Sequence, residues 1–331
     1  MTDADILRFL RGAGLIEADA TPAMEPLTGG VSSDIWKVDT ATDPICVKRA
    51  LPTLKTEKEW HAPVERNANE ADWIRTAAGI VTTVVPEILA EDRDAGMFAM
   101  SFLDPAECPV WKTLLRDGTV RPEFAAAVGN ALGIIHAATA DDPAVADRFA
   151  TDDIFHAIRI EPYLLRTAHS CPDVADRLLV LAETTANTHR VLVHGDVSPK
   201  NILARPDGPV FLDAECAWFG DPAFDLAFCL NHLLLKCVWR PAFTSRYLEC
   251  FDALATAYLE HVSWEPPAQM EERTAALLPG LLLARIDGTS RVEYITEETD
   301  KQTVRRAARY GLVHPSATLA AFRETFREEL T

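Results

Sequence analysis

The sequence is short of basic residues and of glycine, and it has no long uninterrupted apolar run. Its 331 residues include 32 Lys and Arg against 50 Asp and Glu, which gives a formal net charge of −18. Because nucleic-acid phosphates are contacted mainly by Lys and Arg, this balance argues against a nucleic-acid partner. The most apolar stretches, 222–238 and 275–284, are interrupted by polar residues or are too short to span a bilayer. We therefore expect no membrane segment.

The seven cysteines show no CxxC spacing and lie mostly among apolar neighbours. An odd number scattered in this way favours reduced, buried thiols over a disulfide framework or a zinc site. The first residues are acidic and lack the basic start and apolar run of a signal peptide. We expect a cytoplasmic globular protein, either a monomer or a homodimer.

Hydrophobic patterns divide the chain into two parts. The first part has strand-like runs at 35–38, 45–48, 84–90 and 97–103 and helical patterns at 4–15 and about 57–78. The second part has strand-like pieces at 191–193, 202–204 and 210–212 among long helical segments: 122–138, 153–169, 172–188, 222–238, 243–261, 271–284, 301–311 and 316–329. This pattern predicts an α+β protein with a small β-rich lobe over 1–103 and a larger helical lobe over 104–331.

The short β insertion of the second part carries the most informative residues. Asp196 is followed five residues later by Asn201 and seventeen residues later by Asp213, which ends an apolar run. Phosphoryl transfer needs a carboxylate that orients a hydroxyl and accepts its proton, together with oxygen ligands for a magnesium ion on the nucleotide phosphates. An Asn carbonyl and an Asp carboxylate on adjacent strands suit Mg²⁺. We expect Asp196 to be the base, and Asn201 and Asp213 to hold the metal.

These residues resemble a known family. The HGD at 194–196, with Asn201 and Asp213, is similar to the catalytic loop and metal site of the aminoglycoside phosphotransferase and choline kinase family, and FGDPAFDLA at 219–227 resembles its G-D-P-x-x-D-L segment. The resemblance implies a two-lobed protein-kinase-like fold and an ATP-dependent kinase of a small-molecule hydroxyl. It also implies that His194 organises the catalytic loop and that Asp225 hydrogen-bonds its backbone.

The same resemblance implies a nucleotide site in the first lobe. Gly29 and Gly30 form the only adjacent glycine pair among 15 glycines. With Ser32 and Ser33 they lie in a segment, LTGGVSS, that resembles the family's phosphate-covering loop, where backbone N–H groups can approach phosphate oxygens closely. Residues around Met100 and Phe102 occupy the place of the hinge that binds adenine. The residues do not distinguish ATP from GTP.

Further charged residues complete the expected nucleotide site. Lys48 ends the second strand of the hairpin, where the family places the lysine that contacts the α- and β-phosphates, and Glu70 is its expected partner, with Glu65 as the alternative. Glu215 follows Asp213 by two residues and would project to the same side if the strand continued. It would then assist a second magnesium ion, and a solvated carboxylate is the alternative.

The acceptor site is expected in the polar break at 283–294 between two helices. There Arg285, Asp287 and Arg291 would line the pocket, or the segment would be a plain surface turn. Trp218 would add an apolar wall, and WFG at 218–220 loosely resembles methylthioribose kinases. We expect a sugar or sugar-like acceptor. The alternatives are an aminoglycoside O-phosphotransferase conferring resistance and a nucleotide-binding pseudokinase, which the intact charged residues argue against.

Overall fold

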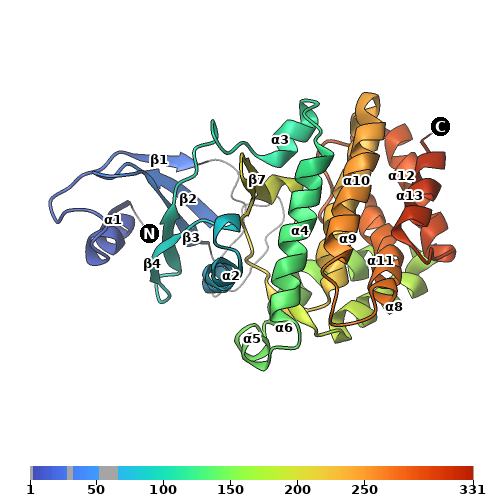
Figure 1. Ribbon diagram of the computed structural model, residues 1–331, viewed down its shortest axis with the longest axis horizontal. Helices are drawn as coiled ribbons and strands as arrows, with labels where there is room; N and C mark the ends of the chain where they lie inside the picture. Colours follow the sequence, from blue (N-terminus) through green and yellow to red (C-terminus); the bar gives the residue numbers. More distant parts are fainter. Residues whose placement is uncertain (1–2, 28–32, 52–65, 331) are drawn as a thin grey trace.

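The computed structural model describes residues 3–27, 33–51 and 66–330. Its first lobe contains a five-stranded antiparallel sheet in the order β1-β2-β3-β5-β4 (Figure 1). The strands are β1 (Met24–Leu27), β2 (Ser33–Val38), β3 (Ile45–Ala50), β4 (Ile88–Asp92) and β5 (Met97–Ser101). The expected hairpin is confirmed, since β2 and β3 pair with Ile35 opposite Lys48. The edge strand β1 was not expected, and residues 82–84 form a short 3₁₀ helix rather than the start of a strand.

Alternating side chains give this sheet two different faces, because successive residues of a strand point to opposite sides. Ile45 and Val47 of β3 pack with Met97 under helix α1 (Asp3–Gly12). Cys46 belongs to the core on the opposite face, which also contains the buried residues of helix α2 (Arg66–Ile80). Lys48, two residues after Cys46, therefore faces α2.

The second lobe is mostly helical (Figure 1). Its helices are α3 (Trp111–Arg116), α4 (Pro122–Thr139), α5 (Pro143–Arg148), α6 (Asp152–Phe155), α7 (Arg166–Ser170), α8 (Ala175–Asn187), α9 (Pro222–Trp239), α10 (Thr244–Leu259), α11 (Pro267–Asp287), α12 (Glu298–Val313) and α13 (Leu319–Glu328). Helix α9 is buried from its first residue to Val238 and packs against α10 and α11, which explains why it is apolar nearly all round. The expected two-lobed α+β fold is confirmed.

Two short antiparallel pairs lie where the β insertion was expected. Strand β6 (Val191–Val193) pairs with β9 (Trp218–Gly220), and β7 (Ile202–Arg205) pairs with β8 (Gly208–Phe211). The chain between the lobes joins the second pair, since the Ala204 N–H donates to the Pro109 carbonyl at 2.8 Å. The β insertion is thereby tied to the segment that connects the two lobes.

A π-helix, His156–Leu165, separates α6 from α7. Pro162 lies inside it and has no N–H, so it cannot donate a helical hydrogen bond at this position. The Arg159 guanidinium donates to the Ile158 carbonyl at 2.7 Å. The widened turn brings Arg159 to the loop that follows β6, where its Nε donates to the Gly195 carbonyl.

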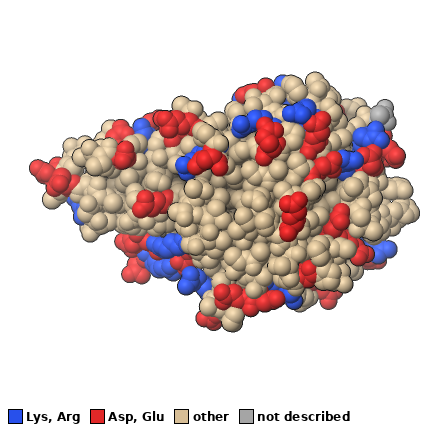
Figure 2. All heavy atoms as spheres, viewed as in Figure 1, with Lys and Arg blue, Asp and Glu red and all other residues tan. Residues whose placement is uncertain are grey.

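Three further features of the fold concern the cysteines, the lengths of the apolar helices and the surface charges. All seven cysteines are free and buried, as expected. Within the described residues, no helix is long and apolar enough to cross a membrane. On the face shown in Figure 2 the acidic side chains are scattered over both lobes rather than gathered in one patch. The location of the protein in the cell stays a prediction.

Candidate active site

Two carboxylates share the ammonium group of Lys48. Its Nζ donates to Glu70 Oε2 and to Asp213 Oδ1, both at 2.5 Å. The second Glu70 oxygen accepts the backbone N–H of Asp213 at 3.1 Å. The structure therefore brings a residue of β3, a residue of α2 and the chain after β8 together at the junction of the lobes. Glu65 lies outside the described residues.

Charge is unevenly distributed over these three groups. Burial alone would lower the pKa of Lys48, but Asp213 and Glu70 raise it overall, so the ammonium stays charged. Burial also opposes ionisation of Asp213, yet Lys48 and then Lys200 hold its pKa well below the usual range. Burial raises the pKa of Glu70 to about 7, because Lys48 offsets only part of the cost. Asp213 is thus the more firmly ionised carboxylate of the pair.

Backbone contacts hold the loop that carries Asp196. Gly195 has a φ of 79°, and an added Cβ would lie 2.8 Å from Cys216 Sγ, so only glycine fits there. The carboxylate of Asp225, at the start of α9, accepts the N–H groups of His194 at 2.7 Å and Gly195 at 2.8 Å. Asp225 thus fixes the backbone immediately before Asp196.

His194 supports the same loop from its other side. Its Nδ1 accepts the Asp196 N–H at 3.1 Å, and its Nε2 lies 3.1 Å from the Leu212 carbonyl, so these partners assign the proton to Nε2. Burial lowers the pKa of His194, which keeps the ring neutral. Trp73 of α2 packs edge-on against it, with ring centroids 4.7 Å apart. His194 therefore positions the loop and contacts both lobes.

Two cations hold one oxygen of the Asp196 carboxylate. Arg159 lies 3.0 Å and Lys200 3.3 Å from its Oδ2. Burial alone would raise the pKa of Asp196, but Lys200 and Arg159 lower it overall. Among the described residues no donor reaches Oδ1. The group is therefore an ionised carboxylate with one oxygen available to a hydroxyl.

Asn201 and Asp213 meet beside this loop. The Asn201 side-chain amide donates to the Asp196 carbonyl at 3.1 Å, and its backbone carbonyl accepts the N–H of Leu212 at 2.9 Å. Within the described residues, neither Asn201 Oδ1 nor Asp213 Oδ2 accepts a hydrogen bond, and no cluster of three or more His, Cys, Asp or Glu could hold a metal by itself. An amide oxygen and a carboxylate oxygen that accept no hydrogen bond are hard donors of the kind that Mg²⁺ prefers.

Glu215 does not continue a strand with Asp213, so that part of the expectation is wrong. Strand β8 ends at Phe211, and Asp213 has a left-handed φ of 69° that turns the chain. Glu215 Oε2 lies 3.2 Å from Arg66 Nε, and the Asn69 side chain donates to the Glu215 carbonyl at 3.2 Å. Its contacts join α2 to the second lobe.

The structure describes only some of the remaining residues of the expected nucleotide site. Ser33 starts β2 and is buried. Met100 lies on β5 opposite Cys46, and Phe102 follows the strand with Lys37 Nζ 5.4 Å from its ring centroid. Gly29, Gly30 and Ser32 lie outside the described residues.

The residues expected around the acceptor do not form one site. Arg285 and Arg291 line one cavity of about 380 Å³. Asp287 is turned to Arg305, with contacts of 2.7–3.1 Å. Trp218 is 1% exposed and lies in the core, where its ring stacks on Phe155 at 4.2 Å. Only the two arginines remain in a position to meet a ligand.

Sequence reasoning missed Arg159, which contacts both Asp196 and the loop backbone. The available signal was Pro162 inside a helical pattern, because a proline there interrupts the regular helical hydrogen bonds. It also missed the support behind Asp225. His136 of α4 lies 3.3 Å from the Asp225 carboxylate and 2.7 Å from the Tyr258 hydroxyl, fully buried.

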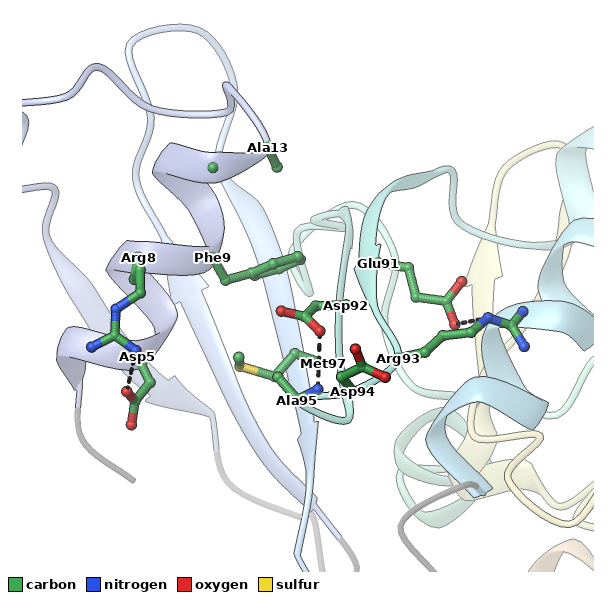
Figure 3. Close-up of a pocket in the computed structure, with 11 residues that line it drawn as sticks. Asp5, Arg8, Phe9, Ala13, Glu91, Asp92, Arg93, Asp94, Ala95 and Met97 are labelled. Carbon is green, nitrogen blue, oxygen red and sulfur yellow. Dashed lines mark hydrogen bonds and ion pairs between the residues drawn. The ribbon is translucent and has the colours of Figure 1, made fainter.

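A cavity of about 580 Å³ lies away from this site, between α1 and the β4–β5 turn (Figure 3). Phe9 and Met97 line it from the α1 side of the sheet, opposite the face that carries Lys48. Several of its charged residues pair with neighbours, as Glu91 does with Arg93 at 3.2 Å. This cavity is separate from the residues described above.

A two-lobed fold with a buried Lys48–Glu70 pair and a carboxylate loop at the lobe junction defines a kinase-like phosphotransferase. The family model described as the phosphotransferase enzyme family matches residues 23–259, and the chain belongs to this family. The expected resemblance and the small-molecule kinase class are confirmed.

Individual relatives agree with this assignment. The chain is similar to a methylthioribose kinase of Bacillus cereus, with 22% identity over 94% of this chain and 90% of that protein. It is also similar to a methylthioribose kinase of Geobacillus thermodenitrificans, with 26% identity over 72% of this chain and 66% of that protein. The fold resembles that of a choline/ethanolamine kinase family protein from Mesorhizobium loti, with a TM-score of 0.57 and 18% identity. The match covers 98% of this chain and 99% of that protein's chain. This likeness confirms the protein-kinase-like fold.

Proposed function

We propose that this protein transfers the γ-phosphate of ATP to a hydroxyl of a sugar or sugar-like metabolite, with Asp196 as the base. The observation that carries the proposal is the ionised Asp196 carboxylate, held at one oxygen by Arg159 and Lys200 and open at the other. Family membership supports phosphoryl transfer. The methylthioribose kinases among the relatives support a sugar as the acceptor.

Asp196 would act by orienting the acceptor. Its free Oδ1 accepts a hydrogen bond from the hydroxyl, which points the oxygen at the γ-phosphorus. As the new O–P bond forms, the bond from phosphorus to the bridging oxygen of ADP breaks, and the hydroxyl proton passes to Asp196 and then to water. Because the pKa of Asp196 is lowered, it is a weak base that takes the proton late, when bonding to phosphorus has acidified the hydroxyl.

The cations around the loop would act on the phosphates. Mg²⁺ held by Asn201 and Asp213 would neutralise phosphate charge. Lys48 is proposed to contact the α- and β-phosphates while Glu70 keeps its ammonium in place. Lys200, with a side chain 53% exposed, would meet the transferring group. The glycine loop, the adenine hinge and the division of the chain at residue 103 stay predictions.

A magnesium-ATP consumption screen tests the proposal. ADP release is measured with sugars, amino alcohols and aminoglycosides as acceptors, with nucleotide binding followed in parallel by calorimetry. We expect at least one sugar-like hydroxyl compound to stimulate ADP release and to appear as a phosphate ester. Bound nucleotide with no stimulation by any acceptor would contradict the proposal and favour a nucleotide-binding scaffold. Preferential use of aminoglycosides would favour the antibiotic-modifying alternative.

A further inference from the structure

A cavity of about 380 Å³ lies where α11 ends and α12 begins. Its volume falls within the usual range for small-molecule sites. The end of α11, the connection after it and the first turns of α12 all contribute to its lining. Four of its lining residues are cations and two are carboxylates: Arg285, Arg291, Lys301, Arg305, Glu293 and Glu298. Positive charge therefore exceeds negative charge in this cavity, although the whole chain carries −18.

Both carboxylates of the cavity already have cationic partners. Glu293 pairs with Lys112 of α3. The Glu298 carboxylate accepts a hydrogen bond from Arg305 at 2.5 Å. Arg305 also holds both carboxylate oxygens of Asp287, at 2.7–3.1 Å. The charges of Glu293, Glu298 and Arg305 are therefore balanced by fixed neighbours.

The other three cations of the cavity have no such partner. Among the residues that the structure describes, Arg285, Arg291 and Lys301 form no ion pair. Arg291 donates only to a backbone carbonyl, at 3.1 Å. Asp287 and Glu298 attract Arg291 and Lys301 from beyond ion-pair distance. The cavity is therefore lined by three positive charges to which the described chain binds no counter-charge.

Arg285 is the most deeply buried of the three, with 8% of its surface exposed. Its guanidinium donates to the Tyr163 hydroxyl at 3.1 Å and to the Ser290 hydroxyl at 2.7 Å. These partners are neutral, and the buried Nε has no partner among the described residues. Burying a guanidinium without a counter-charge is costly, so a bound anion would relieve that cost.

The start of α12 adds a further attraction for negative charge. Thr296 and Glu298, on either side of the first capping position at Glu297, both line the cavity. The Glu297 side chain does not cap the helix, and the Glu298 carboxylate is bonded to side chains of its own helix instead of the backbone. The first N–H groups of a helix and the positive end of its dipole favour anions.

The cavity is separate from the catalytic loop. No residue of the loop at 194–201 lines it. Between Arg285 and Asp196 lie two buried side chains, Tyr163 and Arg159, which are 4% and 8% exposed. The Arg159 guanidinium lies 5.8 Å from the Tyr163 ring centroid and 3.0 Å from the Asp196 carboxylate. Because these side chains fill the path, an anion in the cavity would not present a hydroxyl to Asp196.

We infer that this cavity binds a small oxyanion, a molecule with a phosphate or carboxylate group, through Arg285, Arg291 and Lys301. The site is distinct from the proposed kinase site and does not depend on the proposed function. Guanidinium and ammonium groups are donors without acceptors, and their hydrogen bonds to an oxyanion are charge-assisted. Neutral and cationic molecules lack the charge that this set of donors selects.

Calorimetric titration of the full chain tests the inference. Inorganic phosphate, glycerol 3-phosphate and succinate are the anionic probes, and glycerol and choline are the neutral and cationic ones. Ionic strength is held constant, because salt screens exposed cations. Saturating Mg-ADP keeps the probes from the proposed nucleotide site at Lys48. We expect one site that binds glycerol 3-phosphate at least ten-fold more tightly than glycerol, and the phosphate and succinate titrations identify which oxyanion is preferred.

Variants locate the bound anion. Lys301→Gln and Arg291→Gln should each weaken binding of the preferred anion about ten-fold, because each removes a charged donor. Lys301→Arg should retain most of the affinity. Arg285→Gln tests the buried cation, and the two other variants keep the test decisive if its loss disturbs Tyr163. Arg177→Gln is the matched control, since it removes an exposed cation from α8. Thermal unfolding followed by circular dichroism shows that each variant is folded.

Two kinds of result would overturn the inference. The first is that the anionic probes bind no better than glycerol, or bind equally well to Lys301→Gln and Arg291→Gln. The second is that Mg-ATP phosphorylates glycerol 3-phosphate with a KM that rises in Lys301→Gln, because the cavity would then belong to the acceptor site. The binding measurements do not require turnover, so failure of the proposed kinase function would be a separate result.

Discussion

The buried carboxylate of Asp225 should determine both the stability of the protein and the position of its catalytic loop. It accepts two backbone N–H groups, from His194 at 2.7 Å and from Gly195 at 2.8 Å, and it is fully buried. The Asp225→Asn substitution keeps the shape of the side chain, but the amide accepts hydrogen bonds only at its oxygen. Its NH₂ group would then face a backbone N–H donor. Because hydrogen bonds to charged groups contribute about 1.5–3 kcal/mol each, we expect a loss of about 3 kcal/mol in unfolding free energy.

Catalysis should fall as well, because the loop can no longer hold Asp196 in place. A displacement of about 1 Å typically costs on the order of 100-fold in rate, so kcat should drop by about that factor with little change in ATP affinity. Urea unfolding followed by circular dichroism, together with steady-state kinetics, measures both effects. Asp173→Asn is the matched control, since it changes an exposed carboxylate that pairs with Arg309 and should cost less than about 1 kcal/mol. Unfolding and kcat values for Asp225→Asn close to those of the control would refute the reasoning.

Three further predictions concern other parts of the structure. Gly195→Ala should abolish turnover, because its Cβ would lie 2.8 Å from Cys216 Sγ at a positive φ, whereas Gly79→Ala meets open space and should retain activity in the same assay. Burial, with a further contribution from nearby cations, lowers the pKa of Lys236 in the folded protein from 10.5 to about 7. Between pH 7 and 10.5 the unfolded chain therefore binds a proton at Lys236 that the folded protein has lost. The free energy of unfolding of the wild type should rise with pH over this range. The Lys236→Met variant should therefore be more stable than the wild type at pH 7 in urea unfolding. A difference in unfolding free energy between the two proteins that did not shrink toward pH 10 would contradict this. Asp213→Ala should lose the magnesium dependence of ATP binding measured by calorimetry, and unchanged binding would remove Asp213 from the metal site.

Much of the candidate site could be predicted because its residues are close in sequence or follow strand alternation. Asp196, Asn201 and Asp213 lie within one short stretch, and the pairing of β7 with β8 brings the last two together. Lys48 faces α2 because it shares a face of β3 with Cys46. Local spacing was therefore enough to bring Asp196, Asn201 and Asp213 together, whereas the choice of Lys48 came from the family resemblance.

The positions of the other residues depend on tertiary contacts that the spacing of residues in the sequence does not reveal. Arg159 reaches Asp196 only because the helix around Pro162 widens to a π-helix. Glu215 was misplaced because the left-handed backbone at Asp213 turns the chain away from the strand. Lys236 interrupts an apolar helix, and nothing in the sequence shows that its ammonium lies against the rings of Trp239 and Tyr294.

Asp196→Asn gives the most direct test of the account. The variant keeps the size of the side chain but removes the proton acceptor, so we expect kcat for the best acceptor to fall by about 10²–10⁴-fold. The calorimetric Kd for Mg-ATP should stay within about two-fold, because Lys48, Glu70 and Asp213 carry the proposed nucleotide contacts. A rate near that of the wild type, with the same phosphorylated product, would contradict the account.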